Sequence, residues 1–202
     1  MIQSGFAKYI CERVSRDVYQ ESSDYLLLLR VANRDREALA EMYARFQRPL
    51  FRYLFHLVGH KELAEDLLQE VMVIIWQKAH TFRGTARASG WIFGIAHHQA
   101  FKALRRDGSA TCLELEVVMD LVDEQATPEA DLLRRTTHEE VSLALACLTP
   151  EHREVLELAF FQDFACKEIA AIVGIPVGTV KSRLSYARHA LKAALFRNGW
   201  ET

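Results

Sequence analysis

The sequence predicts an all-α protein in which an acidic linker joins two small helical domains. Glycine and proline number only 9 and 4 among 202 residues, and half of the residues are apolar. The apolar residues recur at three- and four-residue spacing, whereas β-branched residues do not cluster with period two. The formal net charge is only −2, but acidic and basic residues fall in separate blocks. The first two observations predict packed helices, and the third predicts the division into domains.

Composition narrows the class of protein. No apolar run is long enough to cross a bilayer, and the N-terminus lacks the apolar region and cleavage site of a secretory leader. We therefore expect a cytoplasmic protein. No CxxC pair is present, so the cysteines are expected to be plain thiols. They are Cys11, Cys112, Cys147 and Cys166.

One histidine pair has the spacing of a helical metal site. His56 and His60 are four residues apart, but Gly59 lies between them and no glutamate follows His56. The sequence therefore predicts no metal site and no cofactor.

The first domain is predicted to span residues 24–107. Residues 1–23 precede it as an extension that is either flexible or a short amphipathic helix. Asp24 and Asp35 are placed to cap two successive helices, because an aspartate side chain accepts hydrogen bonds from the free N–H groups of a first turn. Pro49 is expected to mark a break or a first turn.

A strong helix is predicted from about residue 61 to residue 80, after a helix end near Gly59. Its broad apolar face suits the centre of a bundle. Its outward strip is Glu62, Asp66, Gln69, Glu70, Val73 and Gln77. Residues 81–90 are expected to form a polar loop and residues 91–106 a helix. The core candidates of that helix include Trp91, Ile95 and Leu104.

Charge and proline separate the second domain from the first. Residues 108–138 are acidic, have weak periodicity and contain Pro128, so they are predicted to be a linker. Residues 139–197 form the second domain. Within it, Thr149, Pro150 and Glu151 are an N-cap, a first-turn proline and an early acid, which together predict a helix start.

Residues 165–188 predict a helix-turn-helix, the unit that places its second helix in the DNA major groove. Gly174 suits the left-handed residue that ends the first helix, and Pro176 fixes the start of the second. The buried stripe of the second helix is predicted to be Val180, Leu184, Ala187 and Leu191. An ordinary helical hairpin with a solvated basic side is the alternative.

Three further segments carry a family resemblance. They are AEDLLQEVMVIIWQKAHTFRG (64–84), WIFGIAHHQAFKALRR (91–106) and LTPEHREVLEL (148–158). With the helix-turn-helix, in this order and at these separations, they resemble the extracytoplasmic-function (ECF) group of bacterial sigma-70-type transcription initiation factors. The resemblance covers about residues 24–196. It implies a sigma region 2 bundle followed by a sigma region 4 domain.

The resemblance implies promoter recognition and no catalytic chemistry. The first domain of this family binds the clamp helices of the largest RNA polymerase subunit and captures the minus-10 element of promoter DNA. The second domain binds the polymerase flap and reads the minus-35 element. The positions that match the polymerase-binding residues are Asp66, Gln69 and Glu70. A solvated face is the alternative for this strip.

The loop before residue 91 and the helix after it match the minus-10 reading segment. Unstacked bases need stacking partners, donors and cations for the phosphates. The candidates are Phe82, Arg83, Arg87, His97, His98, Gln99 and Lys102. Trp91 is assigned to core packing. Relatives usually have Arg-Asn where this chain has His97-His98, and often Asp at the position of Lys102.

The second helix of the helix-turn-helix supplies the minus-35 candidates. Lys181, Arg183 and Arg188 are expected to hold phosphates, whereas Thr179, Ser182 and Tyr186 are placed for base edges. Many relatives have Arg at the position of Tyr186, and tyrosine cannot make the bidentate guanine contact of arginine. Ala165 replaces the usual serine cap.

The family also implies a dedicated anti-sigma factor, often anchored in the membrane, and no small-molecule substrate. The main alternative is a helix-turn-helix transcriptional regulator that is not a polymerase subunit. An enzyme is disfavoured because no nucleophile, base and orienting group stand in a recognisable arrangement.

Overall fold

The computed structural model describes residues 23–106, 145 and 148–197, and these residues form helices and no strand. The expectations for residues 1–22, for the whole predicted linker (108–138), for residues 139–144 at the start of the second domain and for residues 198–202 lie outside this part. Within it, no helix is long and apolar enough to cross a membrane.

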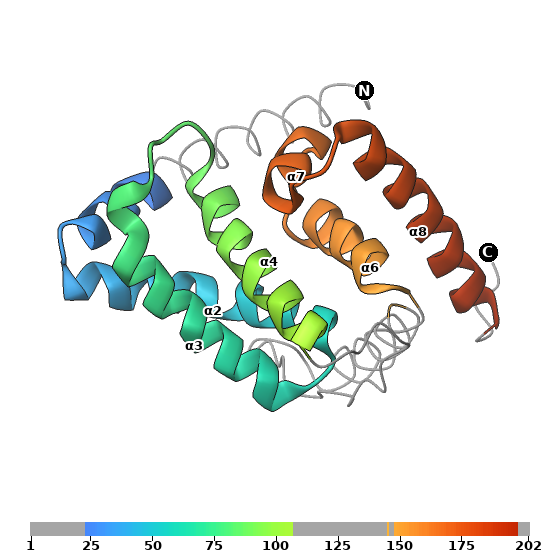
Figure 1. The fold of residues 1–202 in the computed structure, drawn as a ribbon, viewed down its shortest axis with the longest axis horizontal. Helices are drawn as coiled ribbons and strands as arrows, with labels where there is room; N and C mark the ends of the chain where they lie inside the picture. Colours follow the sequence, from blue (N-terminus) through green and yellow to red (C-terminus); the bar gives the residue numbers. More distant parts are fainter. Residues whose placement is uncertain (1–22, 107–144, 146–147, 198–202) are drawn as a thin grey trace, which may run out of the picture.

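The first domain is a helical bundle (Figure 1). Its elements are a helix over residues 23–32, α2 (Arg36–Val58), α3 (Lys61–Lys78), a short 3-10 turn (Ala79–Thr81) and α4 (Ala88–Arg106). α2 packs against both α3 and α4. Fully buried side chains from all three helices, such as Leu54, Ile75 and Ile92, fill the space between them. The predicted helical bundle is confirmed.

Helix ends in this domain follow the predicted capping chemistry at two of three places. The Asp35 carboxylate accepts from the backbone N–H groups of Glu37 and Ala38, at 2.9 and 3.0 Å. Gly59 ends α2 with a left-handed φ of 77°. Asp24, however, lies inside the first helix and is no cap. Its buried carboxylate pairs with Arg45 instead.

The prediction of a break at Pro49 is wrong. α2 runs continuously through Pro49. The proline removes one backbone donor, but Phe46 and Leu50 on either side are buried in the core. Tertiary packing therefore outweighs the local preference of proline.

The core face of α4 agrees with the prediction in part. Trp91, Ile95 and Leu104 pack against the core as predicted, but they stay half-buried at its edge. The buried stripe is Ile92, Phe93, Ala96, Ala100 and Ala103. Small alanines bring the α4 backbone close to its neighbours, so the larger side chains are displaced to the flank of the helix.

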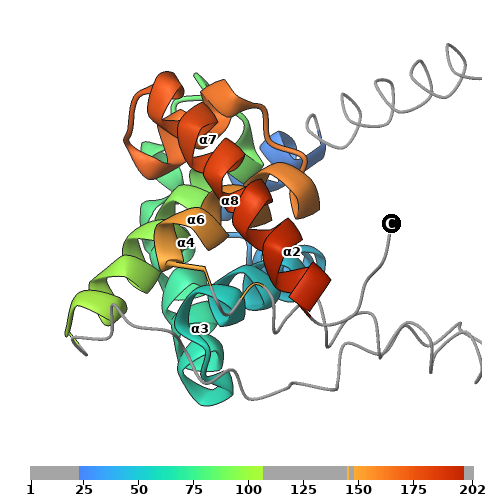
Figure 2. The same cartoon turned by 90° about the vertical axis from the view of Figure 1, so that its right-hand side faces the viewer.

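The second domain carries the helix-turn-helix (Figure 2). Its elements are α6 (Pro150–Leu156), a wider π-helical turn (Glu157–Phe161), α7 (Cys166–Val173) and α8 (Val177–Arg197). Gly174 ends α7 with a φ of 74°, as predicted. Without a serine at position 165, the Glu168 carboxylate still accepts from the Ala165 N–H at 2.7 Å and caps the first turn.

The two domains pack against each other. α7 lies along α4 and α6 lies along α2, and one continuous hydrophobic core includes side chains from both domains. Phe164, just before α7, is buried with its ring edge-on to Phe93 of α4, with centroids 5.5 Å apart. This contact brings the helix-turn-helix next to the predicted minus-10 segment.

Candidate nucleic-acid interface

α3 presents an exposed acidic and amide strip. Asp66, Gln69 and Glu70 are all exposed, because three- and four-residue spacing places them on the side of α3 away from the core. Val73 continues the strip and is 53% exposed. An exposed strip that combines carboxylates with an apolar side chain is typical of a surface that binds a protein with basic residues.

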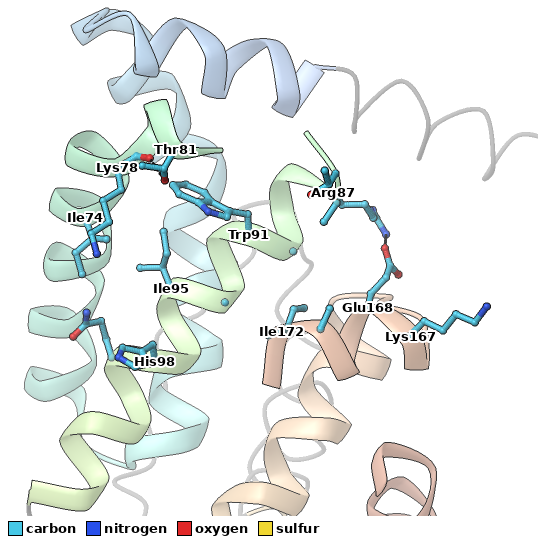
Figure 3. Close-up of a pocket in the computed structure, with 16 residues that line it drawn as sticks. Ile74, Lys78, Thr81, Arg87, Trp91, Ile95, His98, Lys167, Glu168 and Ile172 are labelled. Carbon is cyan, nitrogen blue, oxygen red and sulfur yellow. Dashed lines mark hydrogen bonds and ion pairs between the residues drawn. The ribbon is translucent and has the colours of Figure 1, made fainter. Parts of the chain in front are cut away.

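A cleft of about 820 Å³ opens between α3, α4 and α7 (Figure 3). Trp91, Ile95 and Ile172 supply apolar surface, and positive or hydrogen-bonding groups surround them. The polar lining residues are Lys78, Thr81, Thr85, Arg87, His98, Gln99, Lys167 and Glu168. The mixture of apolar surface and cations could hold a base and its phosphate.

The structure brings some of the predicted minus-10 residues together. Arg87, His98 and Gln99 line the cleft. Arg83 and Lys102 are exposed outside it. Arg87, His98 and Gln99 thus leave donors and positive charge at the cleft, and Arg83 and Lys102 add positive charge to the surface of the first domain.

Phe82 belongs to an aromatic cluster at the base of the loop. It is half-buried, and its ring centroid lies 5.9 Å from that of Tyr25 and 5.6 Å from that of Trp91. Gly84, two residues later, has a φ of 67°, and a Cβ there would lie 3.0 Å from the Tyr25 ring. The loop is therefore fixed by packing as well as by glycine.

His97 faces the second domain. Its Nδ1 lies 2.6 Å from Oε1 of Glu154 in α6, and the Tyr53 hydroxyl donates to the same oxygen at 2.5 Å. Glu154 is fully buried. Burial, and then the charges of Glu154 and Glu157, raise the pKa of Tyr53 well above its ordinary value, so the phenol remains a donor.

A second buried carboxylate, Glu157, joins the same domains. Its oxygens lie 2.8 Å from Nδ1 of His56 and 3.0 Å from Nε of Arg52, both on α2. Burial by itself would raise the pKa of Glu157. The hydrogen bond and charge of His56, with the charge of Arg52, outweigh burial and lower this pKa below its ordinary value.

Arg153 completes this buried group. Its guanidinium donates to the backbone carbonyls of Leu145, Leu148 and, across the domain boundary, His56. No sequence pattern indicates these roles. Every residue from 153 to 158 is buried, and a helix buried on all sides shows no polar face in its periodicity.

The outer face of α8 carries the predicted minus-35 residues. Lys181, Ser182, Tyr186 and Arg188 are exposed, and Thr179 and Arg183 are half-buried. Of the predicted stripe, Val180 and Ala187 are buried, whereas Leu184 and Leu191 are half-buried. Tyr186 is 61% exposed, and its ring lies against His152 with centroids 4.5 Å apart.

The histidines and the cysteine that the structure describes were candidates for a metal site or for reactive chemistry. Among the described residues, no group of three or more metal-ligating side chains comes together. His56 is buried against Glu157, whereas His60 is exposed. Cys166, the one cysteine inside the described ranges, is a free thiol.

Two known protein families match this chain, one in each domain. The sigma-70 region 2 family matches residues 42–110, and the sigma-70 region 4 family matches residues 144–193. Together they cover more than half of the chain.

Two solved structures have a similar fold. The structure of CnrH in complex with the cytosolic domain of CnrY has a TM-score of 0.63 at 20% identity, over 87% of this chain and 99% of that one. The sigma factor RpoE from Bartonella quintana, solved with the anti-sigma factor NepR, has a TM-score of 0.62 at 24% identity, over 77% and 95%.

Curated relatives match over most of their length. The ECF RNA polymerase sigma factor RpoE of Cereibacter sphaeroides is 32% identical over 85% of this chain and 95% of its own. SigL of Mycobacterium tuberculosis is 32% identical over 76% and 86%. YlaC of Bacillus subtilis, an RNA polymerase sigma factor, is 32% identical over 78% and 91%. The chain therefore belongs to the ECF family of RNA polymerase sigma factors.

Proposed function

We propose that three separate surfaces of this sigma factor divide the work of promoter recognition. The α3 strip binds core polymerase, the α4 face with its cleft captures the minus-10 strand, and the outer face of α8 reads the minus-35 duplex. The observation that carries this proposal is the arrangement of charge. The polymerase surface is acidic, and both DNA surfaces are basic although the net charge is −2.

The polymerase surface consists of Asp66, Gln69 and Glu70. Their side chains are exposed on one side of a helix whose opposite side is core. The matching partner is the basic side of the clamp helices in the largest polymerase subunit, and the flap of polymerase binds the second domain. Opposite charges at such a contact speed association and fix its register.

The minus-10 surface combines a cleft with cations around it. A base that leaves the DNA stack can lie against Trp91, while Arg87 and Lys102 hold phosphates. His98 and Gln99 offer hydrogen-bonding groups to base edges. His97 would join them only if its contact with Glu154 were broken. Arg83 adds positive charge, and the Phe82 ring packs against the Trp91 ring.

The minus-35 surface is the outward face of α8 in the major groove. Lys181, Arg183 and Arg188 hold the backbone, which fixes position, while Thr179, Ser182 and Tyr186 contact base edges. A tyrosine at position 186 favours apolar contact, such as with a thymine methyl group, over a bidentate guanine contact.

Regulation by an anti-sigma factor is part of the proposal. The structurally similar CnrH and B. quintana RpoE were both solved with a bound protein, and NepR is an anti-sigma factor. Exposed apolar side chains on both domains offer surfaces for such a partner. They include Leu26, Leu29, Val73, Phe160 and Phe161. The protein acts in the cytoplasm as a binding subunit without catalysis of its own.

Run-off transcription with purified core polymerase tests this function. We expect specific transcripts from native promoters only when this protein is added. A variant with Asp66→Lys and Glu70→Lys should lose them while remaining folded. A helix-turn-helix regulator would bind duplex DNA without conferring initiation on core enzyme, so folded protein with no transcript from any native promoter would refute the proposal.

A further inference from the structure

We propose that His152 of α6, which lies outside the helix-turn-helix, helps to set the minus-35 specificity of this protein by holding the Tyr186 ring in one orientation. His152 is a positioning residue in this role, because it acts through Tyr186 and does not need to touch a base. The inference rests on the proposed function for the role of Tyr186 as a reader of base edges. The contacts that hold the two rings together are present in the protein without DNA.

Tyr186 projects from the surface of α8. Its side chain is 61% exposed, whereas the next residue, Ala187, is fully buried in a small core with Leu156 of α6. A tyrosine side chain has several staggered rotamers. An exposed ring without a neighbour samples several of them, and only one orientation suits a given base edge. A selective contact therefore requires that the ring be held.

His152 supplies that support. The His152 ring lies against the Tyr186 ring, with centroids 4.5 Å apart and planes inclined by 33°. This separation lies in the favourable range for a pair of aromatic rings. The contact covers one part of the Tyr186 side chain and leaves most of it exposed. The ring is thus held without being hidden from DNA.

Thr149 in turn orients His152. Thr149 is the N-cap residue of α6, a position where a threonine hydroxyl usually accepts a hydrogen bond from a backbone N–H of the first turn. Here the hydroxyl lies 2.8 Å from Nδ1 of His152 and takes this contact in place of the first-turn N–H groups of α6. The capping side chain thereby fixes the plane of the imidazole on which the Tyr186 ring rests.

The charges around His152 keep its ring neutral. Arg183 precedes Tyr186 by three residues, so both side chains lie on the same side of α8. Burial, and then the positive charge of Arg183, lower the pKa of His152, whereas the charge of Glu151 acts in the opposite direction. A neutral ring adds no general attraction for phosphates. Its contact with Tyr186 therefore affects orientation and not overall affinity for DNA.

The location of these side chains favours a role in recognition over a role in folding. Thr149 and Tyr186 are exposed, and His152 is half-buried. The small core that joins α6 to α8 is formed by other residues, among them Leu156 and Ala187. Substitutions outside a core usually change stability little. Loss of the His152 ring should therefore change base preference while the second domain stays folded.

Three variants test this role in the complex with core polymerase. His152→Ala removes the ring that supports Tyr186, and His152→Phe keeps a ring without the imidazole nitrogens. Tyr186→Ala removes the reader itself. Glu151→Gln is the matched control, because it changes the residue next to His152 and leaves the two rings in place. If His152→Ala does not fold, His152→Leu replaces it, since leucine keeps apolar bulk but has no planar ring.

Selection of duplexes from a library with a randomised minus-35 element measures the preference at each base position. His152→Ala should weaken the preference about threefold to fivefold at the position that Tyr186→Ala also affects, as expected for loss of one aromatic pair. Preferences at the other positions should stay within about twofold of wild type. The double variant should lose no more than Tyr186→Ala alone, because the two residues act through one contact.

Two further comparisons separate the ring from the fold. His152→Phe should recover at least half of the preference that His152→Ala loses, and Glu151→Gln should match the wild type. Thr149→Val removes the hydroxyl but keeps the branched shape of the side chain. It should weaken the preference at the same position by a smaller factor than His152→Ala, and it should have no further effect there when combined with His152→Ala.

Contrary results are distinct from one another. A uniform loss over all base positions in His152→Ala would mean that His152 only supports the fold, and additive losses in the double variant would mean that the two residues act independently. Either result overturns the inference, as does a His152→Phe protein that behaves like His152→Ala. Wild-type preference in Thr149→Val would overturn the orienting role of the hydroxyl.

A failure of the proposed function gives a different result. If Tyr186→Ala changes the preference at no base position, Tyr186 is not a reader of the minus-35 element, and the inference falls together with that part of the proposed function. If Tyr186→Ala changes one position and His152→Ala changes none, the role of Tyr186 stands and only the role of His152 is overturned.

Discussion

The Glu157 carboxylate lies 2.8 Å from Nδ1 of His56, on a helix about a hundred residues earlier in the chain. Both side chains are almost completely buried. Their contact places an ionisable pair at the boundary between the two domains, and stability should depend on pH through it.

The first prediction concerns that pH dependence. The pKa of Glu157 is lowered from 4.5 in the folded protein, so its stabilising contribution is present above that value and is lost as pH falls through the lowered pKa. Glu157→Gln should lower the free energy of unfolding near neutral pH by about 2–4 kcal/mol, because it leaves Arg52 and His56 without their charged partner.

Denaturant titrations of both proteins across the acidic range would measure this effect. The difference between wild type and Glu157→Gln should shrink as pH falls below 4.5. Glu151→Gln should follow the wild-type curve throughout. A difference that stays constant down to strongly acidic pH would contradict the assignment.

The α3 strip gives the second prediction. Glu70→Lys should weaken binding to core polymerase at least about tenfold, which corresponds to about 1.4 kcal/mol, because a favourable charge contact becomes repulsive. Glu65→Lys is the matched control, since Glu65 is exposed on α3 but lies off the strip. Competition for labelled polymerase would measure the affinity. Equal losses in both variants would indicate a general charge effect.

Tyr186 gives the third prediction. Tyr186→Arg should shift the minus-35 preference toward guanine at one position, by about 1–3 kcal/mol, because arginine can donate two hydrogen bonds to one guanine. Selection from a randomised duplex library with the polymerase complex would reveal the shift. Ser185→Arg adds the same charge at the neighbouring exposed position and should raise affinity without that preference. A similar shift in both variants would contradict the role of Tyr186.

Two glycines give the fourth prediction. Gly84 and Gly174 have similar positive φ values, 67° and 74°, so alanine at either position should cost about 1–2 kcal/mol of stability. Only at Gly84 would the new Cβ also approach the Tyr25 ring, at 3.0 Å. Gly84→Ala should therefore destabilise more than Gly174→Ala in thermal unfolding. The reverse order would show that the loop adjusts without strain.

The sequence was sufficient wherever local chemistry decides the structure. Asp35, Gly59 and Gly174 were assigned correctly because caps depend on the conformation of a few neighbouring residues. The exposed positions of α3 and α8 followed from helical periodicity. Membership in the sigma-factor family followed from motifs that the comparisons confirm.

Sequence patterns were insufficient to predict the features that depend on contacts between residues far apart in the chain. Pro49 stays helical because its neighbours are buried by other helices. The side of α4 that is buried depends on where the neighbouring helices pack, and not on which of its side chains are largest. The alanines of α4 are therefore buried, whereas Trp91 is half-buried. Residues of α2 and α4 contact Glu154 and Glu157 and bury them. The pattern of apolar residues within 150–157 cannot indicate partners that lie so much earlier in the chain.

The exposed α3 strip and the exposed outer face of α8 lie on different helices, and this separation has a consequence for how the protein can diverge. Side chains outside the core can change at little cost to stability. A change on the outer face of α8 therefore leaves the fold and the α3 strip as they are. A duplicated copy of this protein could thus acquire a new set of promoters while it still competes for the same enzyme.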